Sequence, residues 1–395
     1  MINERMSALG KKRSCIREIF EYSLNRRREI GNENVFDFSL GNPSIPAPDA
    51  VGDKLMSLLS ECDPVTLHGY TSAAGDSAVK ETLCAKIRKR FSFPAEPSLM
   101  YMTCGAAASL TITLAAVTRP GEEVILPAPF FPEYRVFTEN AGASVRAVPC
   151  LDGSFQLDID AIDAAINEKT AAIIINSPNN PTGAVFTYDV LNELSQLLRR
   201  RSKEYSRPII LISDEPYREL VYGDVDVPYI PCLYENTVVC YSYSKSLSLP
   251  GERIGYILVS PEMQAADEVF AAVCGAGRSL GYVCAPSMLQ RCVAECDGIK
   301  PDIASYDRNR TRLMNALMDM GYEFTRPDGA FYLFMKALES DAVAFCERAK
   351  KHELLLVPSD DFGVGGYVRI AYCVSYEQIE RSLPAFAALA AEYKN

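Results

Sequence analysis

The chain has 395 residues, of which 48% are hydrophobic and 23% charged, with 40 Lys and Arg against 51 Asp and Glu. This length and composition predict one large or two moderate globular domains with a sizeable core, and they exclude disordered and fibrous proteins. The net charge of −11 repels phosphate backbones and anionic lipids, which argues against a nucleic-acid or membrane-surface role.

The chain's 13 cysteines and 2 histidines are scattered, and no CxxC pair occurs. This spacing fits neither a disulfide framework nor a zinc site, so we expect reduced cysteines, no bound metal and a cytoplasmic protein. The basic residues Lys11, Lys12 and Arg13 are not followed by an apolar segment, and no apolar run is long enough to span a bilayer. We therefore expect neither secretion nor membrane insertion.

The first predicted element is an amphipathic helix over residues 14–30, with Ile16, Ile19, Phe20 and Leu24 on one face. A short apolar run over 35–40 then ends in a Gly-Asn-Pro turn. Six further apolar runs of about strand length lie at 98–103, 123–127, 171–176, 208–213, 237–242 and 253–259. They are rich in Ile and Val, and helical patterns such as 187–201 separate most of them. This predicts an α/β fold whose sheet is mainly parallel and flanked by helices.

The pattern changes after residue 296. A long helical pattern over 302–320 leads to short apolar runs at 331–335 and 367–372, and then to a C-terminal helix over 376–392. This mixture favours a smaller α+β domain. We predict an N-terminal segment (1–40) that packs with the small domain, a large α/β domain (41–295) and a small C-terminal domain (296–395).

Small and polar residues directly follow four of the predicted strands. They form the segments 104–108, 177–183, 214–217 and 243–245, and Arg253 lies shortly after the last of these. Functional groups of an open α/β sheet gather at the carboxyl ends of its strands, so we expect these segments to meet. Each alone has an ordinary alternative: tight packing, a simple turn, a helix N-cap at Asp214, or a solvated Lys245.

In order and spacing, these segments resemble the class I/II aminotransferases among the fold-type-I pyridoxal-phosphate enzymes. The resemblance rests on Asn179–Gly183, Asp214–Tyr217, Ser242–Lys245, Gly251–Gly255, Pro327–Tyr332 and Tyr367–Ile370, and it extends from about Gly41 to Arg369. It implies a large domain with a mainly parallel sheet, a smaller α+β domain, and a homodimer with shared active sites.

The resemblance implies pyridoxal 5'-phosphate as cofactor, and the residue types suit it. Lys245 is then the Schiff-base lysine, Asp214 holds the proton of the pyridine nitrogen, and Asn180 and Tyr217 donate to the ring oxygen. Phe131 is expected to stack on the ring, with a plain core position as the alternative. The residues expected to bind the phosphate are Gly105, Ala106, Ala107, Ser242, Ser244 and Arg253, with Tyr70 reaching over from the second subunit.

For the substrate, the resemblance assigns the α-carboxylate to Arg369, beside Gly41 and Asn180. Arg278 lies within a residue of the position where aspartate-specific relatives carry an arginine for the distal carboxylate of the partner's substrate. An ordinary ion pair or a solvated side chain is the alternative for Arg278.

The resemblance implies ping-pong transfer of an amino group between an L-amino acid and a 2-oxo acid, in amino-acid metabolism. Aspartate and glutamate are reasonable substrates, while aromatic and alanine-type donors stay open. One alternative is a C–S β-lyase on the same fold. Another is a regulator that binds the cofactor as a ligand, although we expect no DNA-binding extension on this acidic chain.

Overall fold

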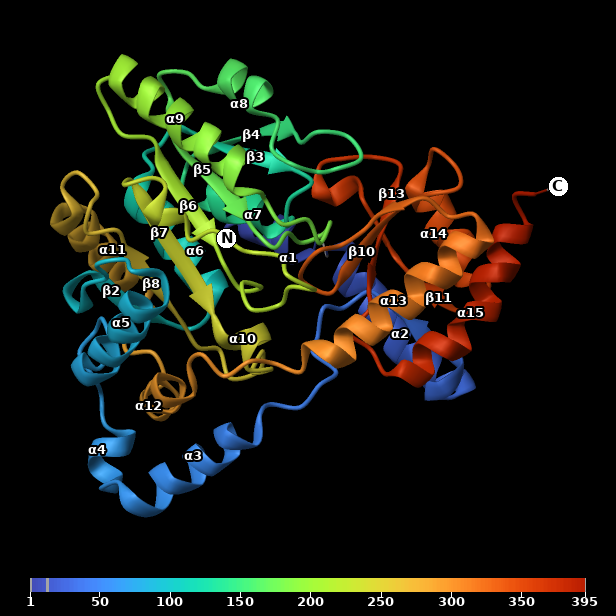
Figure 1. Ribbon diagram of the computed structural model, residues 1–395, viewed down its shortest axis with the longest axis horizontal. Coiled ribbons are helices and arrows are strands. Elements are labelled where there is room, and N and C mark those ends of the chain that lie inside the picture. The colour runs from blue at the N-terminus through green and yellow to red at the C-terminus, as the bar shows by residue number, and fades with distance from the viewer. Residues whose placement is uncertain (1, 12–13, 395) are drawn as a thin grey trace.

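The computed structural model describes residues 2–11 and 14–394 (Figure 1). Met1, Lys12, Arg13 and Asn395 lie outside the described residues, as do the outermost positions of the predicted segments 1–40 and 296–395. Strands fall into a seven-stranded sheet in the larger part of the molecule, a four-stranded sheet in the smaller part, and one isolated pair. Within the described ranges, no helix combines the length and the apolar composition needed to cross a membrane.

The strands are β1 (Phe36–Asp37), β2 (Met100–Thr103), β3 (Glu123–Ala128), β4 (Ser144–Pro149), β5 (Thr170–Asn176), β6 (Ile210–Asp214), β7 (Thr237–Ser242), β8 (Gly255–Val259), β9 (Phe324–Thr325), β10 (Tyr332–Lys336), β11 (Leu354–Leu355), β12 (Val357–Pro358) and β13 (Tyr367–Ala371). The helices are α1 (Glu4–Lys11), α2 (Cys15–Ile30), α3 (Asp49–Glu61), α4 (Pro64–His68), α5 (Ser77–Phe91), α6 (Ala106–Val117), α7 (Glu133–Asn140), α8 (Ile159–Ala165), α9 (Tyr188–Glu204), α10 (Tyr243–Ser246), α11 (Ala266–Leu280), α12 (Ser287–Cys296), α13 (Ile303–Met320), α14 (Ala342–Lys350) and α15 (Tyr376–Ala391).

The seven-stranded sheet has the order β2-β8-β7-β6-β5-β3-β4 and is mainly parallel, as predicted. Its strands β5, β6 and β7 are buried along their whole length, which explains their Ile- and Val-rich sequences without polar alternation. Side chains of α6 and α11 pack on one face, and those of α8 and α9 pack on the other. The four-stranded sheet, in the order β12-β13-β10-β9, packs against α13, α14 and α15.

Strand β8 corrects one expectation. It pairs antiparallel with both β7 and β2, although the run over 253–259 was grouped with strands joined by parallel crossovers. The connection from β7 to β8 holds the one-turn helix α10 and a loop, and it lacks the longer helix that usually forms a parallel crossover. The N-terminal end of β8 therefore lies at the sheet edge where the parallel strands end.

The strand register aligns the ends of the central strands at one edge of the sheet. Asn176 of β5 lies opposite Asp214 of β6, and Ser242 of β7 lies opposite Gly255 of β8. On the other side of β8, Thr103 of β2 lies opposite the same glycine. Segments that leave these strands therefore start from one edge of the sheet.

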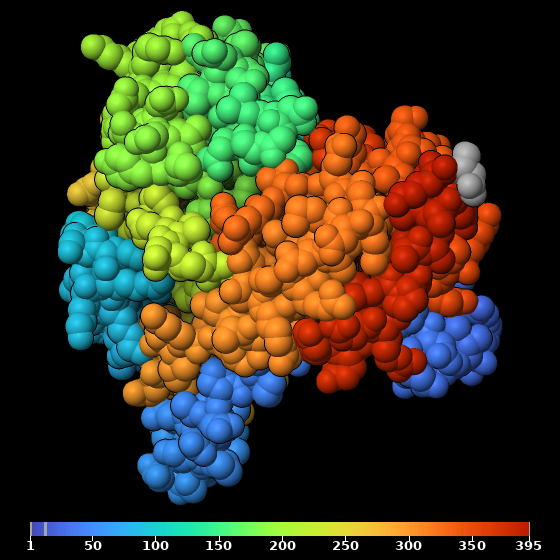
Figure 2. Space-filling model, turned by 45° about the vertical axis from the view of Figure 1, so that its right-hand side comes forward, coloured from blue at the N-terminus to red at the C-terminus, as the bar shows by residue number. Residues whose placement is uncertain are grey.

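The N-terminal helix α2 lies against the smaller part. Ile19 is buried with Leu355 and Val357, and the guanidinium of Arg26 forms an ion pair of 2.6 Å with Glu353. Helices α3 and α4 instead form an arm that projects from the body of the molecule (Figure 2, blue, at the bottom). The domain boundaries at residues 40 and 295 stay predictions.

Candidate active site

A cavity of about 520 Å³ opens at the edge where the central strands end, and both sheets contribute to its wall. The residues that line it are Ser14, Ile16, Arg17, Leu40, Gly41, Ala106, Ala107, Leu110, Phe131, Glu133, Tyr134, Phe137, Asn176, Asn180, Asp214, Pro216, Tyr217, Ser242, Ser244, Lys245, Pro250, Arg253, Tyr332 and Arg369. Thus the polar segments that follow separate strands meet at one place, as the strand order led us to expect.

Asp214 ends strand β6 and lies at the floor of the cavity, with only 5% of its surface exposed. The hydroxyl of Tyr134 donates to Asp214 Oδ2 at 2.5 Å, and the amide of Asn176 donates to the Asp214 backbone oxygen at 2.9 Å. Oδ1 is buried and has no hydrogen-bond partner in the described residues. Burial raises the pKa of Asp214 to about 7. One carboxylate oxygen is therefore fixed, and the other is available to a ligand.

Lys245 lies in the one-turn helix α10 directly after β7, and Ser242 caps this helix by accepting a hydrogen bond from the Ser244 N–H at 3.3 Å. The Nζ of Lys245 donates to the Gly41 carbonyl oxygen at 2.5 Å. Burial lowers the pKa of Lys245 to about 8, because the ammonium loses its hydration there. An appreciable fraction of the side chain is therefore a neutral, nucleophilic amine near neutral pH.

A cradle for an anion lies at the start of α6. Gly105 has φ +82°, and a Cβ atom added there would lie 3.1 Å from Arg253 Nη2 and 3.6 Å from Ser242 Oγ. The Ser242 and Ser244 hydroxyls are 2.7 Å apart. Backbone N–H groups in the first turn of a helix have no partner inside that helix, so they can join the guanidinium and hydroxyls in binding a phosphate.

Arg369 is almost completely buried, with 2% of its surface exposed. Its Nη1 donates to Asn180 Oδ1 at 3.0 Å, its Nη2 donates to the Ser39 carbonyl oxygen, and its guanidinium lies 4.7 Å from the centre of the Tyr332 ring. Nε has no hydrogen-bond partner in the described residues. This guanidinium is fixed in position and retains a donor for a carboxylate.

Two tyrosines also line the cavity, and one of them lies against Gly41. The hydroxyls of Tyr217 and Tyr332 are 2.9 Å apart, and a Cβ atom added to Gly41 would lie 1.9 Å from Tyr332 Oη. Burial raises the pKa of Tyr217 well above its usual range, so the phenol stays protonated and can donate a hydrogen bond. The close approach explains why residue 41 has no side chain.

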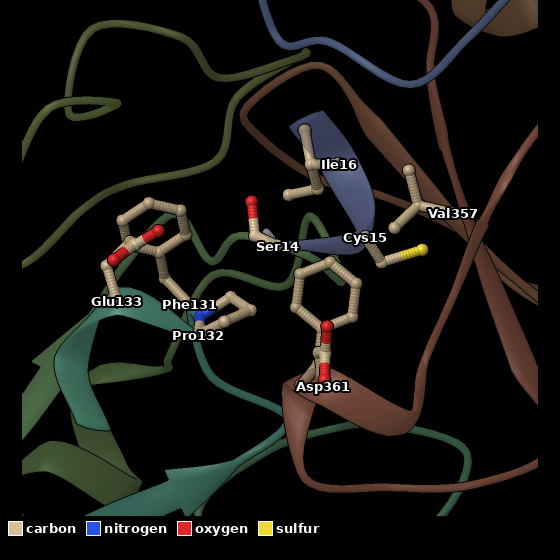
Figure 3. Close-up of a pocket in the computed structure, with 9 residues that line it drawn as sticks. Ser14, Cys15, Ile16, Phe131, Pro132, Glu133, Val357 and Asp361 are labelled. Atoms are coloured by element: carbon tan, nitrogen blue, oxygen red, sulfur yellow. The ribbon is translucent and has the colours of Figure 1, made fainter. Parts of the chain in front are cut away.

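Phe131 lies in the cavity wall, with its ring centre 5.7 Å from that of Tyr134 and the two planes at 85°. Figure 3 shows Phe131 and Glu133 beside the start of α2, in a smaller hollow that adjoins the main cavity. The structure therefore brings Phe131 to the site, although its stacking role stays a prediction.

Apart from Gly105, which directly precedes the lining residues Ala106 and Ala107, two predicted site residues do not line the cavity of their own chain. Tyr70 follows α4 on the projecting arm and is 98% exposed, and Arg278 is exposed near the end of α11. Both were expected to act on a second subunit, so these roles stay predictions.

Sequence reasoning missed Tyr134, Tyr332 and Asn176 as site residues. Asn176 is the last residue of β5, and it both contacts Asp214 and accepts the Asn180 N–H at 2.7 Å. A search for polar residues inside strand ends, and not only after them, would have found it. For Tyr134 the only signal was its position three residues after Phe131.

These residues fit pyridoxal phosphate. The free, buried Asp214 oxygen suits a protonated ring nitrogen, the Lys245 amine suits an aldehyde, and the cradle around Gly105 suits a phosphate dianion. The unpaired Nε of Arg369 suits a substrate carboxylate.

Comparison with known proteins gives one family. Residues 33–386 match the family model described as aminotransferase class I and II. The chain is 29% identical, over 359 residues, to the aspartate aminotransferase of Thermotoga maritima, covering 89% of this chain and 90% of that one. It is also similar to a crystal structure of an amino transferase from Eubacterium rectale, with a TM-score of 0.98, 50% identity and full coverage of both chains. Aspartate aminotransferase from Thermus thermophilus with maleate matches at a TM-score of 0.85 and 27% identity, covering 98% of this chain and 99% of that one.

Proposed function

The chain belongs to the aminotransferases of class I and II, and from this membership we propose that it transfers the amino group of aspartate or glutamate to a 2-oxo acid. The family carries out pyridoxal-phosphate-dependent transamination, and the chain is such an enzyme. Nothing in the comparisons supports the C–S β-lyase or the regulator. The observation that carries the proposal is the meeting of Lys245, Asp214 and Arg369 in one cavity.

Lys245 and Asp214 would each handle one proton of the reaction. When bound, pyridoxal phosphate supplies an electron sink for the electron pair left on the substrate α-carbon. Asp214 would hold a proton at the ring nitrogen, and the hydrogen bond from Tyr134 leaves Oδ1 free for that contact. The Lys245 amine would take the α-proton, since a pKa of about 8 lets it act as a general base near neutral pH.

Other cavity residues would hold the cofactor in place. Tyr217 and Asn180 would donate to its ring oxygen, and Phe131 would cover one ring face. The phosphate would be bound by the cradle already described, which consists of Gly105, Ala106, Ala107, Ser242, Ser244 and Arg253. The support for this assignment is the closeness of the Gly105 backbone to two phosphate-binding side chains: a Cβ atom added there would lie 3.1 Å from Arg253 Nη2 and 3.6 Å from Ser242 Oγ.

Arg369 would bind the substrate α-carboxylate, with Asn180 and the Gly41 backbone beside it. The acidic side-chain preference is supported by the Thermotoga relative, named an aspartate aminotransferase, and by the Thermus structure with maleate, a dicarboxylate. Arg278 of a second subunit is one candidate for the distal carboxylate.

We also propose that the active unit is a homodimer in the cytoplasm. Tyr70 is almost fully exposed on the projecting arm, as expected if it reaches the phosphate of the neighbouring subunit, and apolar side chains on the same arm are exposed. The thirteen cysteines are all free thiols, which is typical of a reducing compartment. Analytical ultracentrifugation and cell fractionation test these two points.

The decisive experiment is a half-reaction screen of the purified holoenzyme. We expect aspartate and glutamate to convert the absorbance of the aldehyde form to that of the amine form, and a 2-oxo acid to reverse the change. A spectrum that no amino acid alters would contradict the proposal. Release of pyruvate and a thiol from cystathionine, without any oxo-acid acceptor, would establish the β-lyase instead.

A further inference from the structure

One cationic side chain in the cavity has no task in the proposed function. Among the described residues, the cations that line the cavity are Lys245, Arg253, Arg369 and Arg17, and the proposed function uses the first three. The Arg17 guanidinium is exposed and makes no hydrogen bond or ion pair anywhere in residues 2–11 and 14–394. A free guanidinium in a substrate cavity is suited to bind a carboxylate with two parallel hydrogen bonds.

Helix α2 fixes where Arg17 lies. The middle and end of this helix are attached to the smaller part through the buried Ile19 and through the ion pair of 2.6 Å between Arg26 and Glu353. Only the first turn reaches the cavity, so Arg17 enters it from an element that carries none of the other cations.

Arg17 and Arg369 reach the cavity from different elements. Figure 3 shows Ser14 and Ile16, on the same turn, beside the segment with Phe131 and Glu133. Arg369 comes from strand β13, is held by Asn180 and Ser39, and lies 5.3 Å from the centre of the Phe362 ring, which lines the same hollow as Ser14 and Ile16. A substrate whose α-carboxylate binds Arg369 can therefore present a second group to α2.

We propose that Arg17 binds the distal carboxylate of the substrate and thereby selects dicarboxylic amino acids over neutral ones. This inference rests on the proposed function and names the residue that sets its side-chain preference. Arg17 acts within its own subunit, whereas Arg278 does not line this cavity and would have to act from a second copy.

Glu133 is the charge that opposes this assignment. Its carboxylate also lines the cavity and makes no ion pair among the described residues, so it does not neutralise Arg17. A negative charge at this position weakens the binding of a second substrate carboxylate, and replacing it with a neutral isostere should strengthen that binding. If the cavity instead bound basic substrates, replacing Glu133 with a neutral isostere would weaken their binding.

The test compares matched substrates and ligands on the holoenzyme. Steady-state kinetics are measured with glutamate against glutamine and with aspartate against asparagine, and calorimetry measures the binding of succinate against butyrate. The variants are Arg17→Ala, Arg17→Lys, Glu133→Gln and Arg278→Ala. Arg28→Ala, which removes an exposed arginine near the other end of α2, is the matched control.

We expect Arg17→Ala to raise KM for glutamate and aspartate and to weaken succinate binding, each on the order of 10- to 100-fold, because a charge-assisted hydrogen-bonded contact is lost. Glutamine, asparagine and butyrate should change less than about twofold, which also shows that the variant is folded. Arg17→Lys should keep part of the preference, Glu133→Gln should increase it, and Arg28→Ala should leave it unchanged.

The inference is overturned if Arg17→Ala raises KM for glutamate and for glutamine equally. It is also overturned if Arg278→Ala alone removes the preference for dicarboxylic amino acids. It is also overturned if the wild type prefers basic amino acids and loses that preference in Glu133→Gln. Failure of the proposed function looks different, because then no amino acid changes the spectrum of the bound cofactor. Succinate binding needs no turnover, so it tests Arg17 in that case as well.

Discussion

The hydroxyl of Tyr134 donates a hydrogen bond of 2.5 Å to Oδ2 of Asp214, and both side chains are buried. Burial raises the pKa of the carboxyl to about 7, and this hydrogen bond opposes the rise because it stabilises the anion. Tyr134 thus favours the ionised form of Asp214 and occupies Oδ2, while Oδ1 has no hydrogen-bond partner in the described residues.

Tyr134→Phe should therefore raise the pKa of Asp214 further. If catalysis needs the Asp214 anion, activity will be lost at a higher pH as the solution is acidified, and kcat at pH 7 should fall about 10-fold with partial recovery at higher pH. The pH profile of kcat measures this, with Tyr188→Phe on the surface as control. An unshifted acidic limb would show that Tyr134 does not act through the carboxylate.

Lys245 should react as a weakly basic amine in the cofactor-free protein. Its lowered pKa means that the ammonium form dominates below about pH 8 and the nucleophilic amine above it. Competitive acetylation followed by mass spectrometry should give a midpoint near pH 8, with the exposed Lys169 as an internal reference. Labelling that keeps rising toward pH 10 would contradict the lowered pKa, and Lys245→Ala should abolish turnover.

Arg369→Lys should raise KM for every amino acid substrate by about 10-fold or more and change kcat less. A lysine supplies a point charge and cannot reproduce the planar guanidinium that contacts Asn180 and retains a free Nε donor. Steady-state kinetics check this, with Arg381→Lys, exposed on α15, as control. If KM is unaltered for all substrates, the α-carboxylate is bound elsewhere.

Gly41→Ala should reduce kcat/KM by more than about 10-fold. Its Cβ atom would lie 1.9 Å from Tyr332 Oη and 2.8 Å from Cζ, so the loop that accepts the Lys245 hydrogen bond must move. Tyr332→Phe removes the nearer atom and should partly rescue the variant in a double mutant. Gly52→Ala, where no atom lies within 4 Å of the added Cβ, should behave as wild type.

Much of the fold could be predicted from the sequence, because buried strands and amphipathic helices have strong local patterns. The runs at 123–127, 171–176 and 237–242 match β3, β5 and β7 closely, and the C-terminal helix predicted over 376–392 matches α15. Strand β4 was missed because it lies at the sheet edge, where exposed polar side chains interrupt its apolar pattern. The direction of β8 is a tertiary property that the apolar pattern does not encode.

The site residues also fall into two groups: those that a local sequence pattern predicts, and those whose position depends on tertiary packing. Residues at the end of a strand or directly after one, such as Asp214 and Lys245, could be predicted because strand ends meet at one edge. Tyr134 and Arg17 lie on helices, and their approach to the cavity depends on how those helices pack. No local pattern contains that information.

The antiparallel β8 has a mechanical consequence. Because the chain turns back directly after β7, Lys245 and Arg253 stand on the same short excursion from the large sheet, while Arg369 belongs to the small one. If pyridoxal phosphate is bound as proposed, its contacts with Lys245 and Arg253 depend on the large sheet, whereas Arg369 and the attached α2 belong to the smaller part. A shift of the smaller part would then alter the contact with the substrate without altering those two contacts with the cofactor.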